Sequence, residues 1–532
     1  MQISWQPQWT TQVRIESGGR YPLGLNRFHD GLEEILIKGI VGAANRLRYV
    51  TYCCWCIGDI QNYESSSDYP EFVDAFTRRE NALALGLYLM KPPYSVYGSS
   101  AMSKLVTEGI KEYDTTFKLM ASTDLGAYGL YYAGTMFNWG LTESNEKGIV
   151  KLTETGEELY QIIDGQYRAT RPKYYTKFKG RKRVRTDTLL EWALVNDFDN
   201  IRIPMHKAER EFYKAILFRL GKTQTTDYRR DTFAFVMECI ERCAGDGICF
   251  DEDSLRNIHY YSAYRNAQNR QRRFSVPDCF KDVHFYWAVY EGHVYFRWWL
   301  SRYFEVFLNH LKSCDSGATL EEFLDGIEVD EFNDAVAAFS GRRDDFYHKP
   351  MRTLLGLLRS PSDLAYRCSE EALKEDEDFE SPSGVLAKFV LTMANLYVKF
   401  KEIRTDRRYQ YLVLNLGEDL WFEALFRFIN LEKMSVREFL GKVLKKYIID
   451  QHDLIMIEKN DLRRCWFTTE NGRYFHQADE SLIWRPAKYQ TIMNFLSDMK
   501  LVDVGNDKVG LTREGRTFFQ ALLQDYYLDE RH

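Results

Sequence analysis

Two stretches of this 532-residue chain share one pattern: WGLTESNEKGIVKLTETGEEL at 139–159 and LVDVGNDKVGLTREGRTF at 501–518. Each contains a short apolar run, a polar turn, a second short apolar run and then Leu-Thr-x-x-Gly. The Thr of that motif is suited to cap a helix, because its hydroxyl accepts a hydrogen bond from a free amide at the helix start. Helical patterns over 128–137 and 487–499 precede the two stretches, so both predict the order helix, β-hairpin, helix.

This repeated pattern resembles the wing and final helix of winged helix-turn-helix domains, in which a hairpin follows the recognition helix. A coincidental similarity between two capped helices is the alternative. Stretches with a 3.6-residue apolar period predict further helices over 32–60, 189–196, 209–220, 232–243, 295–311, 385–400 and 420–429. The expected fold class is mainly α: a multi-domain helical protein with winged-helix modules near the N-terminal third and at the C-terminus.

We expect four segments. Residues 1–165 form an N-terminal helical region ending in a winged helix, and 166–188 form a basic linker. Residues 189–432 form a helical middle domain, and 433–532 form a C-terminal winged-helix domain. The function of the middle domain is not indicated by any motif in it.

Three local signals predict helix starts and a turn. Thr319 to Glu322 and Ser435 to Glu438 match the capping box, in which hydroxyl and carboxylate satisfy the first free amides of a helix. Asn471-Gly472 separates two strand-like runs and predicts a tight hairpin, because both residues tolerate positive φ.

Composition excludes several classes of protein. Lys and Arg number 71 against 77 Asp and Glu, a net charge of -6, so the chain as a whole is not a polybasic nucleic-acid coat. The longest apolar run, 82–90, is far shorter than the roughly 20 residues of a membrane span. We therefore expect no membrane association. Ten cysteines and a start without signal-peptide features favour a cytoplasmic location.

The cysteines do not match a metal-binding pattern. Cys53, Cys54 and Cys56 lie in an apolar helical stretch and are interpreted as buried packing residues. Cys239 and Cys243 share a helix face, with Cys249 and His259 nearby, so a zinc site is geometrically possible, but this cluster contains no CxxC pair. We expect no metal and no cofactor.

Catalytic motifs are absent from the sequence. It contains no GxxxxGK[ST] loop for nucleotide phosphates, no HExxH and no GxSxG. We therefore expect a protein that is not an enzyme. An unrecognised nuclease is the least favoured alternative, because no acidic cluster has the spacing of two-metal chemistry.

A basic segment gives the clearest indication of nucleic-acid binding. Residues 165–186 contain nine Lys or Arg and no Asp or Glu. Such cations displace counterions from phosphates, and four interleaved rings are suited to stack on bases. A solvated linker without a partner is the alternative. The candidate DNA-binding residues are Arg168, Arg171, Lys173, Lys177, Lys179, Arg181, Lys182, Arg183 and Arg185, with the rings of Tyr167, Tyr174, Tyr175 and Phe178 between them.

The presumed recognition helices are poor in cations. Residues 125–138 contain no Lys or Arg, and 487–499 offer Lys488, Gln490, Thr491 and Asn494, of which Lys488 alone is a cation. Because base edges and phosphates are contacted mainly by Arg, Lys, Asn and Gln, both modules suit docking onto protein better than reading DNA sequence. We expect the C-terminal module to dock through an apolar face. A dense aromatic stretch, 286–307, is interpreted as core, with base stacking as the alternative.

The N-terminal residues carry a family resemblance. The stretches YPLGL at 21–25, LIKGIVGAANRLRY at 36–49 and YCCWCI at 52–57 resemble a segment of bacterial conflict proteins that is followed by a winged helix. With a winged helix at each end, the chain resembles the middle component of SMC-ATPase defence systems of the Lamassu type.

That resemblance implies a non-catalytic, kleisin-like scaffold in a DNA-sensing complex directed against phages and plasmids. Its implied partners are an SMC-like ATPase subunit, an effector subunit that is a nuclease, and double-stranded DNA. A stand-alone winged-helix DNA-binding regulator is the alternative function.

Overall fold

Helices form most of the chain in the computed structural model, which describes residues 23–64, 68–90, 97–107, 109–219, 228–266, 268, 270–358, 381–416, 431–458, 465–479, 488–505 and 508–529. The expectation of a mainly α fold is therefore confirmed. Every sheet in these residues is a pair of antiparallel strands. Tyr21 and Pro22 of the N-terminal resemblance and the helix expected over 420–429 lie outside the described residues.

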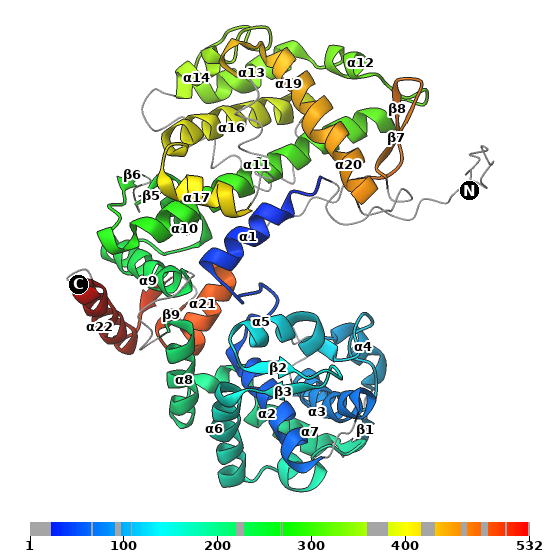
Figure 1. Ribbon diagram of the computed structural model, residues 1–532, viewed down its shortest axis with the longest axis vertical. Coiled ribbons are helices and arrows are strands. Elements are labelled where there is room, and N and C mark those ends of the chain that lie inside the picture. The colour runs from blue at the N-terminus through cyan, green and yellow to red at the C-terminus, as the bar shows by residue number, and fades with distance from the viewer. Residues whose placement is uncertain are drawn as a thin grey trace, which may run out of the picture. The chain divides into compact units, whose positions relative to one another are not determined.

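The chain divides into two compact units, whose helices and strands are labelled in Figure 1. Unit 1 comprises the described residues of Met1–Leu32, His259–Tyr261 and Phe285–Arg485, and unit 2 those of Glu33–Ile258, Ser262–His284 and Pro486–His532. The four segments predicted from the sequence do not coincide with these units, because the last residues of the chain join unit 2 while those before them belong to unit 1.

Unit 1 is organised on the long helix α11 (Lys281–Lys312), whose residues from 285 onward belong to it. The rings of Trp299, Tyr303 and Phe307 on α11 are buried, so they serve the core and are not accessible to bases. The other elements are α12 (Leu320–Asp325), α13 (Val329–Ser340), α14 (Arg352–Leu358), α16 (Pro382–Ile403), α17 (Arg407–Leu416), η6 (Leu431–Lys433), α19 (Val436–Val443), η7 (Leu444–Ile449), α20 (Asp450–Glu458), β7 (Phe467–Glu470) and β8 (Arg473–His476).

Local signals in unit 1 are confirmed. Both predicted capping boxes form: the Thr319 hydroxyl accepts from the Glu322 amide, and Ser435 does the same for Glu438. Asn471 and Gly472 have φ of 51° and 77° and join β7 to β8 in a tight hairpin.

Unit 2 surrounds helix α2 (Leu47–Tyr63), in which every residue from Leu47 to Ile60 is buried. The other helical elements are α3 (Tyr69–Met90), α4 (Ser99–Leu105), η1 (Tyr128–Tyr132), α5 (Ala133–Asn138), α6 (Glu154–Thr170), η2 (Tyr174–Phe178), α7 (Thr186–Val195), η3 (Phe198–Arg202), η4 (Pro204–His206), α8 (Lys207–Leu217), α9 (Arg229–Gly245), α10 (Glu252–Tyr261), η5 (Asp278–Phe280), α21 (Tyr489–Asp498) and α22 (Arg513–Asp529). Its strands pair as β1 (Glu112–Asp114) with β4 (Arg183–Arg185), β2 (Thr142–Ser144) with β3 (Val150–Leu152), β5 (Ala263–Arg265) with β6 (Gln271–Arg273), and β9 (Val502–Val504) with β10 (Val509–Leu511).

One predicted helix is wrong. The stretch 32–60 is split, because α1 (Asn26–Leu36) ends at Leu36 and α2 begins at Leu47. Gly39 lies between them with φ of 75°, and a Cβ there would lie 2.8 Å from the Cβ of Asn138. The chain therefore turns at Gly39, where its backbone lies close to α5. The period of apolar residues does not indicate this turn.

The two repeated stretches fold alike within unit 2. Each forms helix, two-stranded hairpin and helix, as the sequence predicts: α5, β2, β3 and α6, then α21, β9, β10 and α22. The capping threonines are equivalent, because Thr153 Oγ1 accepts from the Gly156 amide at 3.2 Å and Thr512 Oγ1 from the Gly515 amide at 2.9 Å.

The turns that enter the hairpins are equivalent as well. Gly140 and Lys500 both have left-handed φ, 71° and 62°. Their carbonyl oxygens accept hydrogen bonds from the capping hydroxyls, Thr153 at 2.5 Å and Thr512 at 2.7 Å. The Leu-Thr-x-x-Gly motif thus ties the start of the final helix to the start of the hairpin.

The glycine of that motif is required by close packing. A Cβ at Gly156 would lie 2.0 Å from the carbonyl oxygen of Leu141, and one at Gly515 would lie 1.9 Å from that of Leu501. No real Cβ atom approaches a backbone oxygen so closely, so the final helix reaches the hairpin only where a side chain is missing.

Alanine at either glycine should therefore destabilise the protein. We expect Gly156→Ala and Gly515→Ala each to cost about 1–3 kcal/mol through backbone displacement. The control is Gly165, which is exposed in the middle of α6, where a Cβ would have no neighbouring atom within 4 Å. Gly165→Ala should stabilise by about 0.5–1 kcal/mol, since alanine favours a helix. Urea unfolding measures all three, and equal stability of G156A and G165A would contradict the close packing.

Candidate nucleic-acid interface

The basic segment is built into unit 2 by three consecutive elements. It takes in the end of α6, the π-helical turn η2 and the strand β4. Strand β4 pairs with β1, so that Arg185 lies opposite Glu112 and Arg183 opposite Asp114. Hydrogen bonds on either side of the ladder, such as Thr115 N to the Lys182 carbonyl at 2.8 Å, extend the pairing. The backbone of these cations is thereby held in place.

Lys179 anchors the segment to the core. Its ammonium lies 2.5 Å from Oδ1 of Asp59, a residue of α2 that is fully buried. The other carboxylate oxygen of Asp59 accepts two hydrogen bonds from the Arg79 guanidinium, at 3.0 and 2.7 Å. The ring of Tyr63 lies 4.3 Å from the Lys179 nitrogen. Lys179 therefore compensates a buried charge and is not a solvated surface cation.

The remaining eight cations are exposed and fall into two groups. Arg168, Lys173 and Arg185 pair with carboxylates of Asp164, Glu191 and Asp187 at 2.6, 3.4 and 3.2 Å. In the described part of the chain the other five have no carboxylate oxygen within 4 Å: Arg171, Lys177, Arg181, Lys182 and Arg183, which we call the basic face.

An acidic side chain near the basic face is already engaged. Asp114 accepts hydrogen bonds from the amide and hydroxyl of Thr116 at 2.7 and 2.6 Å. These bonds, with the nearby charges of Arg183 and Lys182, hold the pKa of the Asp114 carboxyl below its ordinary value. Asp114 is therefore ionised and offsets part of the positive charge of Arg183 and Lys182, so the five cations of the basic face keep a smaller but still positive net charge.

The interleaved rings do not form a stacking platform. Tyr167 and Tyr174 are fully buried, and both pack on Trp192 with ring centroids 4.7 Å apart. Tyr175 and Phe178 are half-buried. The rings join the segment to the core of unit 2, so any nucleic-acid contact there rests on charge.

The helices that precede the two hairpins differ in what they expose. Elements η1 and α5 expose Leu130 and Phe137, which are 42% and 65% accessible. Helix α21 instead buries its apolar side chains within unit 2, where the Phe495 ring lies 5.8 Å from that of Trp139. The apolar face of α21 is thus occupied by its own unit, whereas Leu454 and Ile457 on α20 and Val504 on β9 are 55%, 66% and 49% exposed, so the expected docking of the C-terminal module stays a prediction.

The one cation of the second presumed recognition helix is also occupied. Lys488 pairs with the carboxylate of Glu33 at 3.1 Å, and both side chains are largely buried. At the other end of α21, Asp498 accepts from the Leu47 amide at 3.0 Å, at the start of α2. Both ends of α21 are therefore fastened inside unit 2.

A second group of cations, on the hairpin of β5 and β6, was not predicted from the sequence. Arg270, Arg272 and Arg273 are exposed there. The signal was available, because residues 255–277 contain five arginines and no Asp or Glu. The same count that singles out 165–186 therefore finds this hairpin too.

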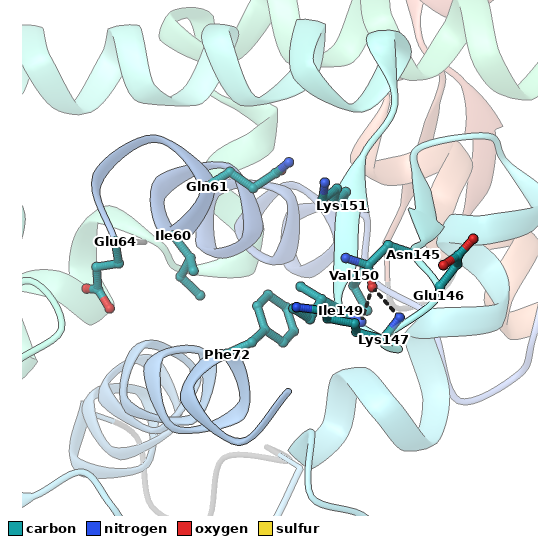
Figure 2. A pocket seen from close by; sticks show the side chains of 10 residues that line it. All are labelled: Ile60, Gln61, Glu64, Phe72, Asn145, Glu146, Lys147, Ile149, Val150 and Lys151. Carbon is teal, nitrogen blue, oxygen red and sulfur yellow. Dashed lines mark hydrogen bonds between the residues drawn. The ribbon is translucent and has the colours of Figure 1, made fainter. Parts of the chain in front are cut away.

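A cavity of 540 Å³ lies between α2, α3 and the first hairpin (Figure 2). Its polar groups serve the fold: Asn145 Oδ1 accepts from the amides of Lys147 and Ile149, and Glu64 binds Arg79 at 2.6 Å. Two carboxylates and two ammonium groups are present in its wall, which consists of Ile60, Gln61, Glu64, Phe72, Asn145, Glu146, Lys147, Ile149, Val150 and Lys151. This mixture gives no preference for an anion or a cation.

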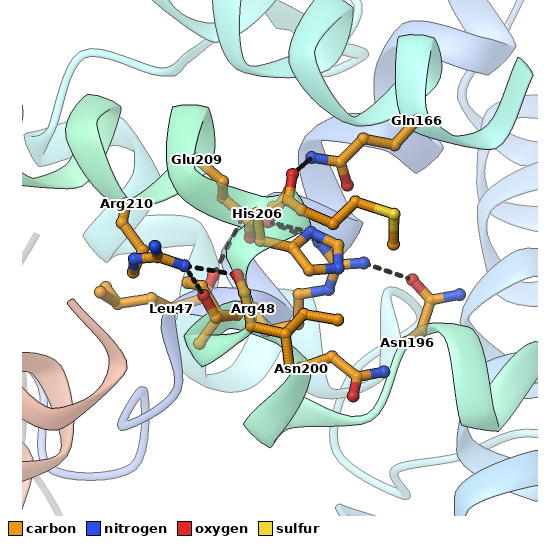
Figure 3. Close-up of polar contacts among 12 residues, drawn as sticks. Leu47, Arg48, Gln166, Asn196, Asn200, His206, Glu209 and Arg210 are labelled. Carbon is orange, nitrogen blue, oxygen red and sulfur yellow. Dashed lines mark hydrogen bonds and ion pairs between the residues drawn. The ribbon is translucent and has the colours of Figure 1, made fainter. Parts of the chain in front are cut away.

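A buried ionic network joins α2 to α8 (Figure 3). Arg48 donates to Glu209 Oε2 at 2.5 Å, and His206 Nδ1 lies 3.2 Å from the same oxygen. Burial raises the pKa of Glu209, but Arg48 and hydrogen bonds from His206 and Thr51 outweigh it, so this pKa lies below its ordinary value. Burial lowers the pKa of His206. Arg48 and Glu209 therefore form a balanced pair that locks two helices together.

No metal centre is found among the residues that the structure describes: none of their His, Cys, Asp and Glu form a group of three suited to an ion. Cys53, Cys54 and Cys56 are buried in α2, as expected, and burial raises the pKa of all three thiols. Within the same residues no helix has the length and apolar character to cross a membrane. Comparison with protein-family models, curated proteins and solved structures found no match for this chain.

The role of Lys179 can be tested apart from DNA. Lys179→Met leaves Asp59 Oδ1 without its donor inside the core, so we expect a loss of about 1–3 kcal/mol in the free energy of unfolding. Lys177→Met, at an exposed and unpaired position two residues away, should change it by less than about 0.5 kcal/mol. Urea unfolding of the two variants makes the comparison, and equal stabilities would show Lys179 to be an ordinary surface cation.

Proposed function

We propose that this chain is the non-catalytic bridging subunit of a bacterial SMC-type, DNA-sensing defence complex. In this proposal the two repeated modules are winged helices, an SMC-like ATPase and a nuclease effector dock on the chain, and the basic face contacts double-stranded DNA in the cytoplasm. The resemblance of the N-terminal residues and the repeated module supports the assignment to such a complex.

The observation that carries the DNA part is the set of five exposed cations without carboxylate partners. A cation already paired with a carboxylate must give up that interaction when it binds phosphate, whereas an unpaired cation gives up only water and counterions. Arg183 lies on β4, whose backbone is paired with β1, and Arg181 and Lys182 directly precede it. Lys177 lies on η2, and Arg171 follows the last residue of α6. Backbone contact without base reading fits this arrangement.

The exposed apolar residues before the first hairpin support docking onto protein. Leu130 and Phe137 lie where a winged helix would carry its recognition surface, yet they offer no hydrogen-bonding group to a base edge. Exposed aromatic and aliphatic side chains are typical anchors of protein interfaces. We assign this surface to the ATPase subunit.

A stand-alone regulator is less well supported. Sequence reading needs a helix that can enter the major groove with free polar side chains. Lys488 is paired with Glu33, and both ends of α21 are fastened inside unit 2. Among the described residues of α21 and its start, the one cation is therefore already paired, and the exposed Gln490 donates to Asn494 at 2.8 Å, which disfavours the regulator.

Replacing the basic face should weaken DNA binding equally on all sequences. With R171Q, K177Q, R181Q, K182Q and R183Q combined, we expect the plot of log affinity against log salt to become shallower by roughly 4 to 5, about 0.9 for each phosphate that is no longer neutralised. The measurement is binding of the full chain to random duplexes at several salt concentrations.

The control for this experiment removes the same charge from paired cations of unit 2. Glutamine replaces Lys118, Arg202, Arg242, Lys281 and Arg516, each of which lies within 4 Å of a carboxylate. This variant should keep most of the affinity, because these cations are already compensated. If both variants bind alike, net charge rather than the basic face governs binding and the DNA part of the proposal is lost.

Charging the exposed apolar surface should release the ATPase. We expect Leu130→Asp with Phe137→Asp to lower the amount of SMC-like ATPase recovered with the tagged chain by roughly 30-fold, the effect of losing about 2 kcal/mol at an interface. Leu194→Asp, at a residue 61% exposed on α7, is the matched control and should not change the recovery. Affinity purification from the native host with quantitative mass spectrometry gives the answer.

Two results would refute the docking assignment. Recovery of the ATPase with the double variant at the level of the control would place its contact elsewhere. If no SMC-like ATPase accompanies the wild-type chain at all, the proposed complex itself is wrong.

A further inference from the structure

The hairpin of β5 and β6 is firmly based in unit 2. At its foot, the Phe274 amide donates to the Ser262 carbonyl at 2.7 Å, and the Phe274 ring packs 5.9 Å from that of Phe235. The hydroxyl of Tyr264 donates to the carboxylate of Asp246 at 2.6 Å. In the ladder, Tyr264 lies opposite Arg272. The foot and the two paired strands of this hairpin, which we call the arm, are therefore held by hydrogen bonds and by packing on the core of unit 2.

The tip of this arm is closed without a carboxylate. The side-chain oxygen of Asn266 accepts from the amides of Gln268 and Arg270 at 3.2 and 2.9 Å. The Asn266 amide in turn donates to the Arg270 carbonyl at 2.9 Å. Aspartate accepts such turn bonds equally well, so the amide here keeps negative charge away from the arm.

Three arginines of the arm, on β6 and directly before it, have no carboxylate partner among the described residues. Arg270, Arg272 and Arg273 are exposed, and none of them has a carboxylate oxygen within 4 Å in the described part of the chain. Three other arginines of unit 2, one half-buried and two exposed, differ in this respect: Arg202, Arg242 and Arg516 pair with carboxylates at 3.3, 2.7 and 3.2 Å. Three guanidinium groups within four residues repel one another, so an anionic partner would relieve that repulsion.

We infer that this arm inserts its guanidinium groups into the minor groove of duplex DNA. The cations between residues 262 and 277 are all arginine, without a lysine. Guanidinium is planar and less strongly hydrated than ammonium, and it is the group that narrow minor grooves attract through their enhanced negative potential. Basic arms enter that groove while another surface of the same protein holds the backbone. The arm is separate from the basic face in sequence and in secondary structure.

This inference rests on the proposed contact with duplex DNA, and one binding experiment tests the two separately. The full chain is titrated with an A·T-rich duplex, bare or pre-bound by netropsin, which fills the minor groove. We expect R270Q, R272Q and R273Q together to weaken binding to the bare duplex at least about tenfold and to flatten the salt slope by about 2 to 3. Netropsin should weaken the wild type by a similar factor and leave the glutamine variant unchanged.

Two further variants separate the effect of the guanidinium group from the effect of charge alone. Lysine at the three positions keeps the charge but not the guanidinium group, so we expect it to restore only part of the affinity. Glutamine at Arg202, Arg242 and Arg516 removes the same charge from paired arginines of the same unit and should leave binding near the wild-type level. Far-ultraviolet circular dichroism confirms that each variant is folded.

The outcomes are distinct. If the hairpin variant binds like wild type while the basic-face variant is weakened, the inference fails and the proposed function stands. If netropsin has no effect on the wild type, or the lysine variant binds fully, the arm does not read the minor groove. A wild-type chain that binds no duplex overturns both.

Discussion

The two charged side chains of the buried helix α2 determine how the neighbouring helices of unit 2 pack on it. Arg48 near its start and Asp59 near its end are both out of contact with water. An isolated buried charge is costly, so each must bring a partner of opposite sign into the core. The ion pair of Arg48 with Glu209 therefore fixes α8 against one end of α2, and the ion pair of Asp59 with Arg79 fixes α3 against the other. The packing around α2 follows from these two ion pairs as much as from its apolar residues.

The second pair also positions the candidate DNA surface. Asp59 has two carboxylate oxygens, and Arg79 binds only one of them. The other is bound by Lys179, 120 residues farther along the chain. That contact fastens the basic segment between η2 and β4, while Tyr167 and Tyr174 pack on Trp192 beneath it. One lysine and two tyrosines thus serve the fold, and the neighbouring cations are left to face solvent.

Sequence reasoning succeeded where an interaction is local. The capping boxes, the Asn-Gly turn and the Leu-Thr-x-x-Gly motif are each determined within about a dozen residues, and all of them form. It failed where distant residues decide. The residues around Lys179 contain no signal for its ion pair with Asp59. Likewise, the residues around Glu112 contain no signal that this strand pairs with the one at Arg185. Counting charges along the chain found the basic segment, but it could not separate the anchoring lysine from the exposed cations or show that the rings are buried.

Whether a cation already has a carboxylate partner indicates its capacity to bind phosphate better than the total charge of the chain does. Lys488 belongs to a presumed recognition helix, but Glu33 already compensates it. Arg168, Lys173 and Arg185 lie beside the basic face, but carboxylates within 4 Å reduce what a phosphate could gain from them. Setting these paired cations aside leaves Arg171, Lys177, Arg181, Lys182 and Arg183. In the rest of unit 2 other exposed cations, such as Lys104, Lys207 and Arg513, also meet this criterion, but the hairpin of β5 and β6 places three such arginines within four residues. A net charge of -6 is therefore compatible with DNA binding, because the acidic excess of the chain lies outside these segments. The local electrostatic potential at these cations remains positive.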